Sequence, residues 1–161
     1  MAKEKKQKEA TLENVLWECR VALRGYGSFE KNRDAVIGLT FLKFASDKFE
    51  KRKAEIKEEN PDMPFLTERP SSYNAKNVYY LDEECRWEYI KKHASDDDIA
   101  VKIDKAMKRI EEKNPALLGT LPQNAYVGLG APKEKIKDLI DEINKINEKR
   151  FQEEDLIGRV Y

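Results

Sequence analysis

The stretch that most constrains the fold is AVIGLTFLKFASDKF, residues Ala35 to Phe49. Eight of its first eleven residues are apolar, and they fall on more than one face of a helix. Such a helix is stable only where other elements enclose it, so the sequence predicts a central, enclosed helix. Ala35, Gly38, Leu42 and Ala45 recur at helical spacing, and this mostly small stripe would let another helix approach closely.

The central helix is expected to follow the loop SFEKNRD and to run into a charged segment. Phe49 and Ile56 carry a narrower apolar stripe into KFEKRKAEIKEE, where the helix should emerge into solvent. It should end near Asn60-Pro61, because a residue before proline avoids helical angles.

Four further segments carry apolar residues at helical spacing. The first follows Thr11 and ends before two glycines, the second begins at Asp82, the third at Ser95 with Asp98 in a capping-box-like pattern, and the fourth at Pro132. Their apolar residues are, in chain order, Leu12, Val15, Leu16, Cys19, Ala22 and Leu23; Trp87, Tyr89 and Ile90; Ile99, Ile103, Ala106, Met107 and Ile110; and Ile136, Leu139, Ile140, Ile143 and Ile146. We therefore expect a mainly α, compact, bundle-like domain of five to six helices.

Long loops are expected between these helices. Prolines exclude regular helix from Asn60 to Lys76, and residues 116–131 form a second loop. The apolar anchors expected in that second loop are Leu117, Leu118, Leu121, Tyr126 and Leu129. Asn77 to Leu81 reads NVYYL, which is β-prone and short, and predicts one strand of a minor hairpin.

The two ends of the chain differ from its middle. Residues 1–10 hold four lysines, two glutamates and nothing to bury, so we expect a disordered charged tail. Residues 11–154 form the helical domain. Residues 155–161, DLIGRVY, begin an apolar face behind an N-cap at Asp155, which suggests the start of a helix that continues in a longer protein.

Composition and motifs exclude several classes of function. Acids and bases number 31 each, so no overall charge attracts nucleic acid, and any DNA contact needs a local patch. The chain has no apolar run of membrane-spanning length and no signal peptide, so a cytoplasmic protein without a membrane partner is expected. Cys19 and Cys85 are isolated and His93 is the single histidine, which predicts buried thiols and no metal site.

No catalytic constellation is present either. The sequence lacks a phosphate-binding GKS or GKT loop, a GxSxG motif, and a strand followed by GxGxxG. Neither Asn60-Pro61 nor Asn114-Pro115 continues into the Asn-Pro-Pro-aromatic motif with which amino-methylating DNA enzymes hold a flipped base. This chain alone is therefore expected to bind no cofactor and to catalyse nothing.

A cluster of basic residues on the central helix is the candidate contact surface. From Lys43 to Lys57 there are six bases and three acids, a net charge of +3, and Asp47 is expected to pair with Lys51. The candidate phosphate or subunit contacts are Lys43, Lys48, Lys51, Arg52 and Lys53. A merely solvated face is the alternative, with Lys43 and Lys48 packing through their aliphatic stems. Trp87 beside Arg86 is either part of the core or a base-stacking platform.

Several segments together resemble the N-terminal helical domain of the modification (M) subunit of type I restriction-modification DNA methyltransferases. The segments are LRG at Leu23–Gly25, GLTFLKFASDKFE at Gly38–Glu50, NVYYLDEECRWEYI at Asn77–Ile90, NPALLGTLP at Asn114–Pro122 and DLIGRVY at Asp155–Tyr161. Two mild departures from the family pattern, at Leu81 and at Asp82–Cys85, leave the fold expectation intact.

The resemblance implies that a catalytic domain follows Tyr161, binds S-adenosylmethionine and methylates adenine N6. It further implies that two M subunits join one specificity subunit, and that the helical domains help to clamp DNA through backbone contacts. A free-standing helical adaptor that binds another protein is the main rival. A self-contained nuclease or hydrolase is a more distant one.

Overall fold

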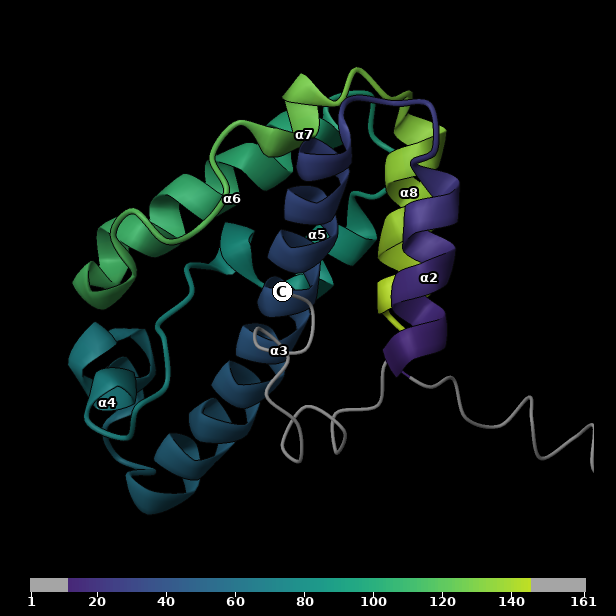
Figure 1. Ribbon diagram of the computed structural model, residues 1–161. Helices are drawn as coiled ribbons and strands as arrows, with labels where there is room; N and C mark the ends of the chain where they lie inside the picture. The colour runs from purple at the N-terminus through teal and green to yellow at the C-terminus, as the bar shows by residue number, and fades with distance from the viewer. Residues whose placement is uncertain (1–11, 146–161) are drawn as a thin grey trace, which may run out of the picture.

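The computed structural model describes residues 12–145 (Figure 1). Within that range the chain forms seven α-helices and three 3₁₀ turns and contains no strand, which confirms a mainly α domain. The helices are α2 (Leu12–Ala22), α3 (Phe29–Glu59), α4 (Pro70–Asn74), α5 (Trp87–Lys92), α6 (Ile99–Lys113), α7 (Ala125–Gly128) and α8 (Lys133–Ile143), and the turns are η1 (Pro64–Glu68), η2 (Glu83–Cys85) and η3 (Pro115–Leu117). None of these helices is long and apolar enough to cross a membrane. The tail 1–10, Ile146 and the helix expected from Asp155 lie outside the described residues.

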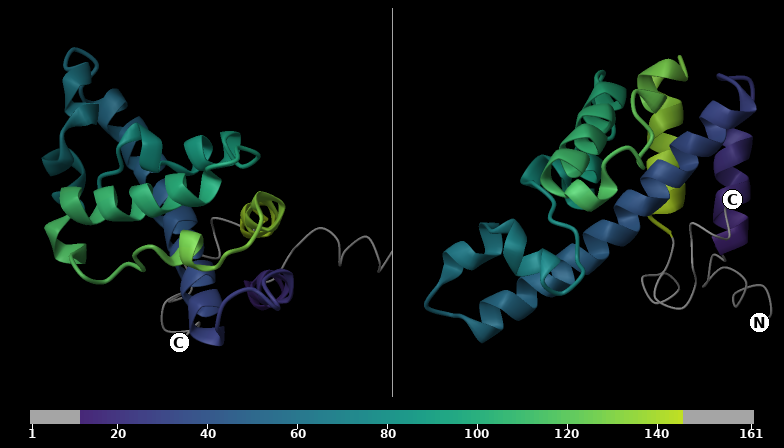
Figure 2. Two further views of the ribbon diagram at one scale, coloured as in Figure 1. Left: turned by 90° about the horizontal axis from the view of Figure 1, so that it is seen from above. Right: turned by 60° about the vertical axis from the view of Figure 1, so that its left-hand side comes forward.

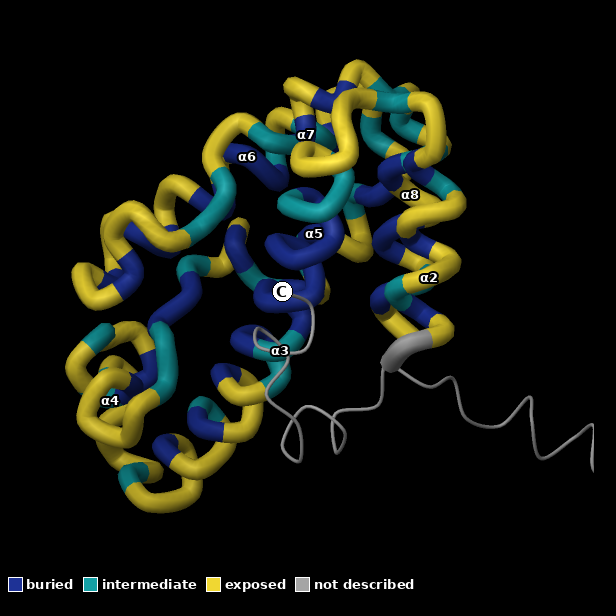
Figure 3. The backbone as a smooth tube through the Cα atoms, viewed as in Figure 1, coloured by how far each residue is buried: buried dark blue, intermediate teal, exposed yellow. Residues whose placement is uncertain are grey.

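Helix α3 is the axis of the fold. Every residue from Ala35 to Lys43 is buried, which confirms the expected enclosure, and Figure 3 shows this part of α3 in dark blue. The helix begins earlier than expected, at Phe29, because the Ser28 side chain caps it by accepting a hydrogen bond from the Lys31 amide at 3.1 Å. Asn60 is its C-cap, so the expected end is confirmed.

The other predicted helices bury the predicted faces. Helices α2 and α8 lie side by side and antiparallel at one end of α3 (Figures 1 and 2). Helix α5 packs on the middle of α3, α7 packs nearer its beginning, and α6 lies against both. Helix α2 buries Val15 and Cys19. Helix α6 buries Ile99, Ile103, Ala106, Met107 and Ile110, and helix α8 buries Ile136, Leu139, Ile140 and Ile143.

The C-terminal half of α3 extends away from α2 and α8 into an arm that η1 and α4 close (Figure 2). The expectation of an irregular connection from Asn60 to Lys76 is therefore wrong in part. Pro64 and Pro70 each stand in the first turn of a helical segment, where the missing N–H disrupts no helical hydrogen bond. Phe49 of α3 stacks on Tyr73 of α4, with 4.5 Å between the ring centroids, and this packing holds the arm together.

The second loop contains a helix as well. Residues 116–131 include α7 and the last residues of η3, and three of the five expected anchors, Leu117, Tyr126 and Leu129, are buried. Leu121 is partly buried against the core, whereas Leu118 is 74% exposed, so the prediction was wrong for Leu118.

The strand predicted at Asn77–Leu81 is absent from the described chain. The Asn114 carboxamide accepts a hydrogen bond from the Tyr80 N–H at 2.8 Å and donates one to the Tyr80 carbonyl at 2.8 Å. A side-chain amide therefore takes the hydrogen bonds that a neighbouring strand would make, and no second strand is needed.

Two predicted helix starts were also wrong. Asp82 precedes the 3₁₀ turn η2 rather than an α-helix, and its carboxylate accepts hydrogen bonds from Arg109 of α6, including one from Nε at 2.9 Å. Helix α6 begins at Ile99 rather than near Ser95, and neither Asp82 nor Asp98 makes a side-chain capping bond. Lys102, one turn along α6, binds the Asp98 carboxylate at 2.6 Å instead. Ion pairs with neighbouring cations thus replace the expected caps.

The two cysteines are buried free thiols, as predicted. Burial raises the pKa of both Cys19 and Cys85 to about 12, so both stay protonated at neutral pH. They behave as small apolar core side chains.

Candidate interaction surfaces

The two sequence blocks around Ser46 and Trp87 pack directly on each other. The Ser46 hydroxyl oxygen accepts a hydrogen bond from the Trp87 N–H at 2.8 Å, and the Arg86 guanidinium lies 4.5 Å from the centroid of the Phe49 ring. These contacts fix α5 to the middle of α3. The blocks therefore build the fold and do not form a reactive site.

Trp87 belongs to the core and is not a base-stacking platform. The residue is 3% exposed, and its indole Nε1 donates a hydrogen bond to the Asn144 side-chain oxygen at 2.7 Å. The ring thus joins α5 to the residue that follows α8. A buried ring with a satisfied N–H has no face left for a nucleic-acid base.

Two of the five predicted contact residues are buried and ion-paired. Lys43 Nζ lies 2.6 Å from the Asp47 carboxylate, so the expected pair of Asp47 with Lys51 was wrong. Arg52 Nε donates to the Ser72 carbonyl of α4 at 3.2 Å, and its guanidinium also lies 3.3 Å from Glu55. Arg52 therefore fastens the arm, and neither side chain is presented to a partner as a free cation.

The other three predicted residues do not form a single patch. Lys48 Nζ lies 4.9 Å from the Phe44 ring centroid, Lys51 is exposed and Lys53 is half-buried. Residues two apart on a helix point about 200° away from each other, so Lys51 and Lys53 lie on different flanks of α3. The sequence cluster is divided in space, and contact of Lys48, Lys51 and Lys53 with DNA or a subunit stays a prediction.

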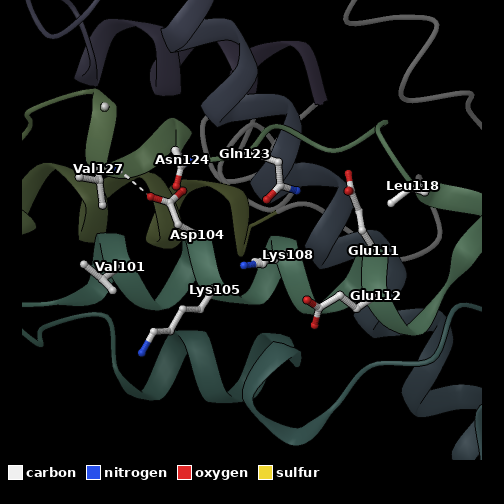
Figure 4. A pocket seen from close by; sticks show the side chains of 11 residues that line it. Val101, Asp104, Lys105, Lys108, Glu111, Glu112, Leu118, Gln123, Asn124 and Val127 are labelled. Carbon is white, nitrogen blue, oxygen red and sulfur yellow. Dashed lines mark hydrogen bonds between the residues drawn. The ribbon is translucent and has the colours of Figure 1, made fainter.

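A groove of about 750 Å³ lies between α6 and residues 118–128 (Figure 4). Three apolar side chains on its wall are unusually exposed: Val101 at 41%, Leu118 at 74% and Val127 at 53%. Lys105 and Lys108 of α6 stand beside them and are exposed.

Two of the three carboxylates that line the groove, Asp104 and Glu111, bind the backbone of its wall. Asp104 of α6 accepts hydrogen bonds from the amides of Tyr126 at 3.1 Å and Val127 at 3.0 Å, and so caps α7. Figure 4 shows the bond from Val127. Glu111 accepts a hydrogen bond from the Leu121 amide at 2.8 Å. Both groups hold the loop in place, so they supply no free acid–base pair. Within residues 12–145 no three histidine, cysteine or acidic side chains gather as a metal site.

The pKa of Asp104 gives a pH-dependent prediction. Burial raises the pKa of its carboxyl, while hydrogen bonds from the Val127 and Tyr126 amides oppose that rise. Ionisation of a group with a raised folded pKa destabilises the fold. That destabilisation is absent at low pH and grows as the pH rises from about 3.9, the unfolded value, through the folded pKa.

We therefore expect the free energy of unfolding of the wild type to fall relative to that of Asp104→Asn across this window. Urea denaturation of the wild type and of Asp104→Asn at a series of pH values measures this difference. If the free energies of unfolding of the two proteins change with pH in parallel, the raised pKa of Asp104 is contradicted. Asp138→Asn removes an exposed carboxyl of α8 and is the charge-matched control.

A second exposed surface lies on α2, and the sequence prediction missed it. Trp17 is 59% exposed and Val21 is 39% exposed, one helical turn apart, and Phe29 at the start of α3 is 57% exposed. The Arg20 guanidinium lies 4.5 Å from the Phe29 ring centroid, and Arg24 is exposed in the turn that follows α2. We call these five residues the α2 face. The sequence signal for it was Trp17, which lies off the apolar stripe of the first helix.

Comparison with known proteins places the chain in a family context. The model of the HsdM N-terminal domain family matches residues 12–143. The chain is also 30% identical, over 162 residues, to the type I restriction enzyme MjaIX methylase subunit of Methanocaldococcus jannaschii. That alignment covers 92% of this chain and 29% of the relative, so the chain spans less than a third of that curated relative.

Proposed function

The chain belongs to the HsdM N-terminal domain family, and we propose that it acts as the non-catalytic helical domain of a type I restriction-modification methylase (M) subunit. In this role it helps to assemble the subunits and to clamp DNA. S-adenosylmethionine-dependent methylation of adenine N6 belongs to the complete protein. The observation that carries the proposal is the family match over residues 12–143, nearly the same range as the described fold.

The chemistry of the described residues supports a scaffold role. Five buried polar side chains bind backbone groups of the domain itself: Ser46, Arg52, Asp104, Glu111 and Asn114. These contacts hold loops and short helices on α3 and α6. Side chains committed in this way hold a structure together and are not free for acid–base work.

The proposed partners are a specificity subunit, a second M subunit and the DNA backbone. The family match and the relative, which is a methylase subunit, favour this proposal over a free-standing adaptor. Sequence reading would reside in the specificity subunit, and the helical domain would contribute contacts that position the duplex without reading its bases.

The test compares this chain with the complete reading frame that contains it. With labelled S-adenosylmethionine and DNA, the complete protein together with its specificity subunit should methylate adenine N6, and residues 1–161 alone should not. Methyl transfer by the chain alone would refute the non-catalytic assignment. An inactive complete assembly that binds S-adenosylmethionine would refute the proposed reaction.

The DNA contact has its own test in the complete assembly. Replacing Lys48, Lys51 and Lys53 with glutamine removes the three candidate charges that are not buried. Each lost phosphate contact should reduce the slope of log affinity against log salt by about one unit.

The control for that test is the triple replacement of Lys105, Lys108 and Lys113 with glutamine, which removes the same charge from exposed positions on α6. Equal slopes for wild type and the α3 variant would exclude DNA contact by these lysines. Equal changes in both variants would indicate a general charge effect with no role specific to α3.

A further inference from the structure

We propose that residues 153–161 of this chain dock in cis on the α2 face, formed by Trp17, Arg20, Val21, Arg24 and Phe29. This inference does not depend on the methylase assignment. It rests on the composition of the α2 face, on the sequence of residues 153–161 and on where the described chain ends.

The α2 face has the composition of a protein-binding surface. Three of its residues expose apolar side chains on a domain whose other apolar residues are mostly buried. Exposed apolar patches of this kind mark interaction sites, and tryptophan and arginine are the residues most enriched where binding energy concentrates. The Arg20 guanidinium is held over the Phe29 ring, so cation and apolar surface are presented together.

This composition favours a protein segment over a DNA backbone. A phosphate backbone would pair with Arg20 and Arg24 but would leave the side chains of Trp17, Val21 and Phe29 without apolar contact. The matching occupant carries apolar side chains together with carboxylates.

Residues 153–161, EEDLIGRVY, have that chemistry. Glu153, Glu154 and Asp155 give three consecutive carboxylates, and the apolar residues that follow are Leu156, Ile157, Val160 and Tyr161. The acids complement Arg20 and Arg24, while the apolar residues match the exposed apolar surface. The opposite end of the chain does not fit, because residues 1–10 carry four lysines and no large apolar side chain other than Met1.

The described chain ends beside α2, on its buried side, which carries Cys19 and lies opposite Trp17. Lys145 and Glu142 act electrostatically on Cys19, and Glu18 acts on Lys145, so the end of α8 lies beside this turn of α2. Residues 146–152 can span about 23 Å when extended, and a helix with its side chains is about 10–12 Å across. The chain can therefore pass around α2 and bring residue 153 to the outer face.

Quenching of tryptophan fluorescence by acrylamide tests the proposal on the full chain. Trp87 is 3% exposed, so quenching reports on Trp17. We expect the quenching constant of the wild type to be several-fold below that of Leu156→Asp/Ile157→Asp. Both replaced residues lie outside the described residues, and the emission of buried Trp87 checks that the variant is folded.

Charge reversal gives a second, independent readout. Arg20→Glu/Arg24→Glu should raise quenching of Trp17. Combining it with Glu153→Lys/Glu154→Lys/Asp155→Lys should restore protection, because the ion pairs are re-formed with opposite sign. The matched control Lys105→Glu/Lys108→Glu removes two cations from α6 and should leave Trp17 protected.

Two results would overturn the proposal. In the first, Trp17 of the wild type is quenched as strongly as in the Leu156→Asp/Ile157→Asp variant, which means that nothing covers the α2 face. In the second, protection of Trp17 disappears on dilution, which means that another copy of the chain supplies the contact and docking in cis is wrong.

Discussion

Replacing Gly38 with alanine is expected to lower the free energy of unfolding by about 2 kcal/mol, although alanine is the better helix former. A Cβ atom at this position would lie 2.5 Å from the Tyr126 hydroxyl oxygen and 3.0 Å from Pro122 Cγ. Tyr126 cannot move aside easily, because it is 1% exposed and its hydroxyl donates a hydrogen bond to the Ala35 carbonyl at 2.6 Å.

The size of the effect follows from opposing contributions. Crowding and the loss of the Tyr126 hydrogen bond together cost about 3 kcal/mol, and the gain in helix propensity offsets about 1 kcal/mol of that. For a domain of this size the melting temperature Tm should fall by about 6 °C. Thermal denaturation followed by circular dichroism measures the shift.

Gly128 provides the matched control. A Cβ there meets only the Lys31 ammonium, at 3.8 Å, so Gly128→Ala should leave the stability unchanged or raise it slightly. Combining Gly38→Ala with Tyr126→Phe removes the clashing oxygen, and the double variant should lose less than the sum of the single losses. Equal losses for the two glycine variants, or strict additivity in the double variant, would contradict this account.

Replacing Asn114 with alanine is the other change with a large expected effect, a loss of about 3 kcal/mol in the free energy of unfolding. Asn114 is 2% exposed, and its carboxamide satisfies both the N–H and the carbonyl of Tyr80. Alanine would leave two buried backbone groups without a partner, and each such group costs about 1–3 kcal/mol. Urea denaturation of the wild type and of Asn114→Ala measures this loss in the free energy of unfolding.

Asn60 is an unusually close control for Asn114. Both asparagines are helix C-caps followed by proline, with φ of −135° and −132°, and both donate to the carbonyl four residues back. Asn114 differs from Asn60 in its hydrogen bonds to Tyr80. Asn60→Ala should therefore cost less than about 1 kcal/mol. Similar losses at the two positions would mean that capping, rather than the link to Tyr80, makes Asn114 important.

The sequence predicted those parts of the fold that depend on local periodicity. Helices α2, α3, α6 and α8 were recognisable because their buried residues recur with the helical period and are apolar. Asn60 and Pro61 marked the end of α3 for an equally local reason, the steric restriction before proline.

What the sequence could not show depends on contacts between distant residues. Helix α7 is four residues long and is capped by Asp104, 21 positions before its first residue. The backbone N–H and carbonyl of Tyr80 need no neighbouring strand, because the side chain of Asn114, 34 positions further along the chain, makes hydrogen bonds with both. Propensity in a short window contains none of this information, so α7 was missed and a strand was predicted in error.

The candidate contact residues illustrate the same limit. Lys43, Lys48, Lys51, Arg52 and Lys53 are close in sequence, but a helix distributes consecutive residues around its axis, and burial removes two of them from the surface. The α2 face was missed because exposure depends on which neighbours cover a side chain. Trp17, a large apolar residue off the buried stripe, is the sequence feature that could have revealed it.

Helix α3 is one uninterrupted element of 31 residues, without proline, that passes from the core into the arm. It is about 46 Å long, and Arg52 and Phe49 tie its outer half to α4. Such a helix has no break at which its two halves could bend independently, so it moves as one rigid body. A load on the arm, from duplex or protein, would therefore turn the opposite end near α2 and α8 as well, and a displacement could travel mechanically across the whole domain.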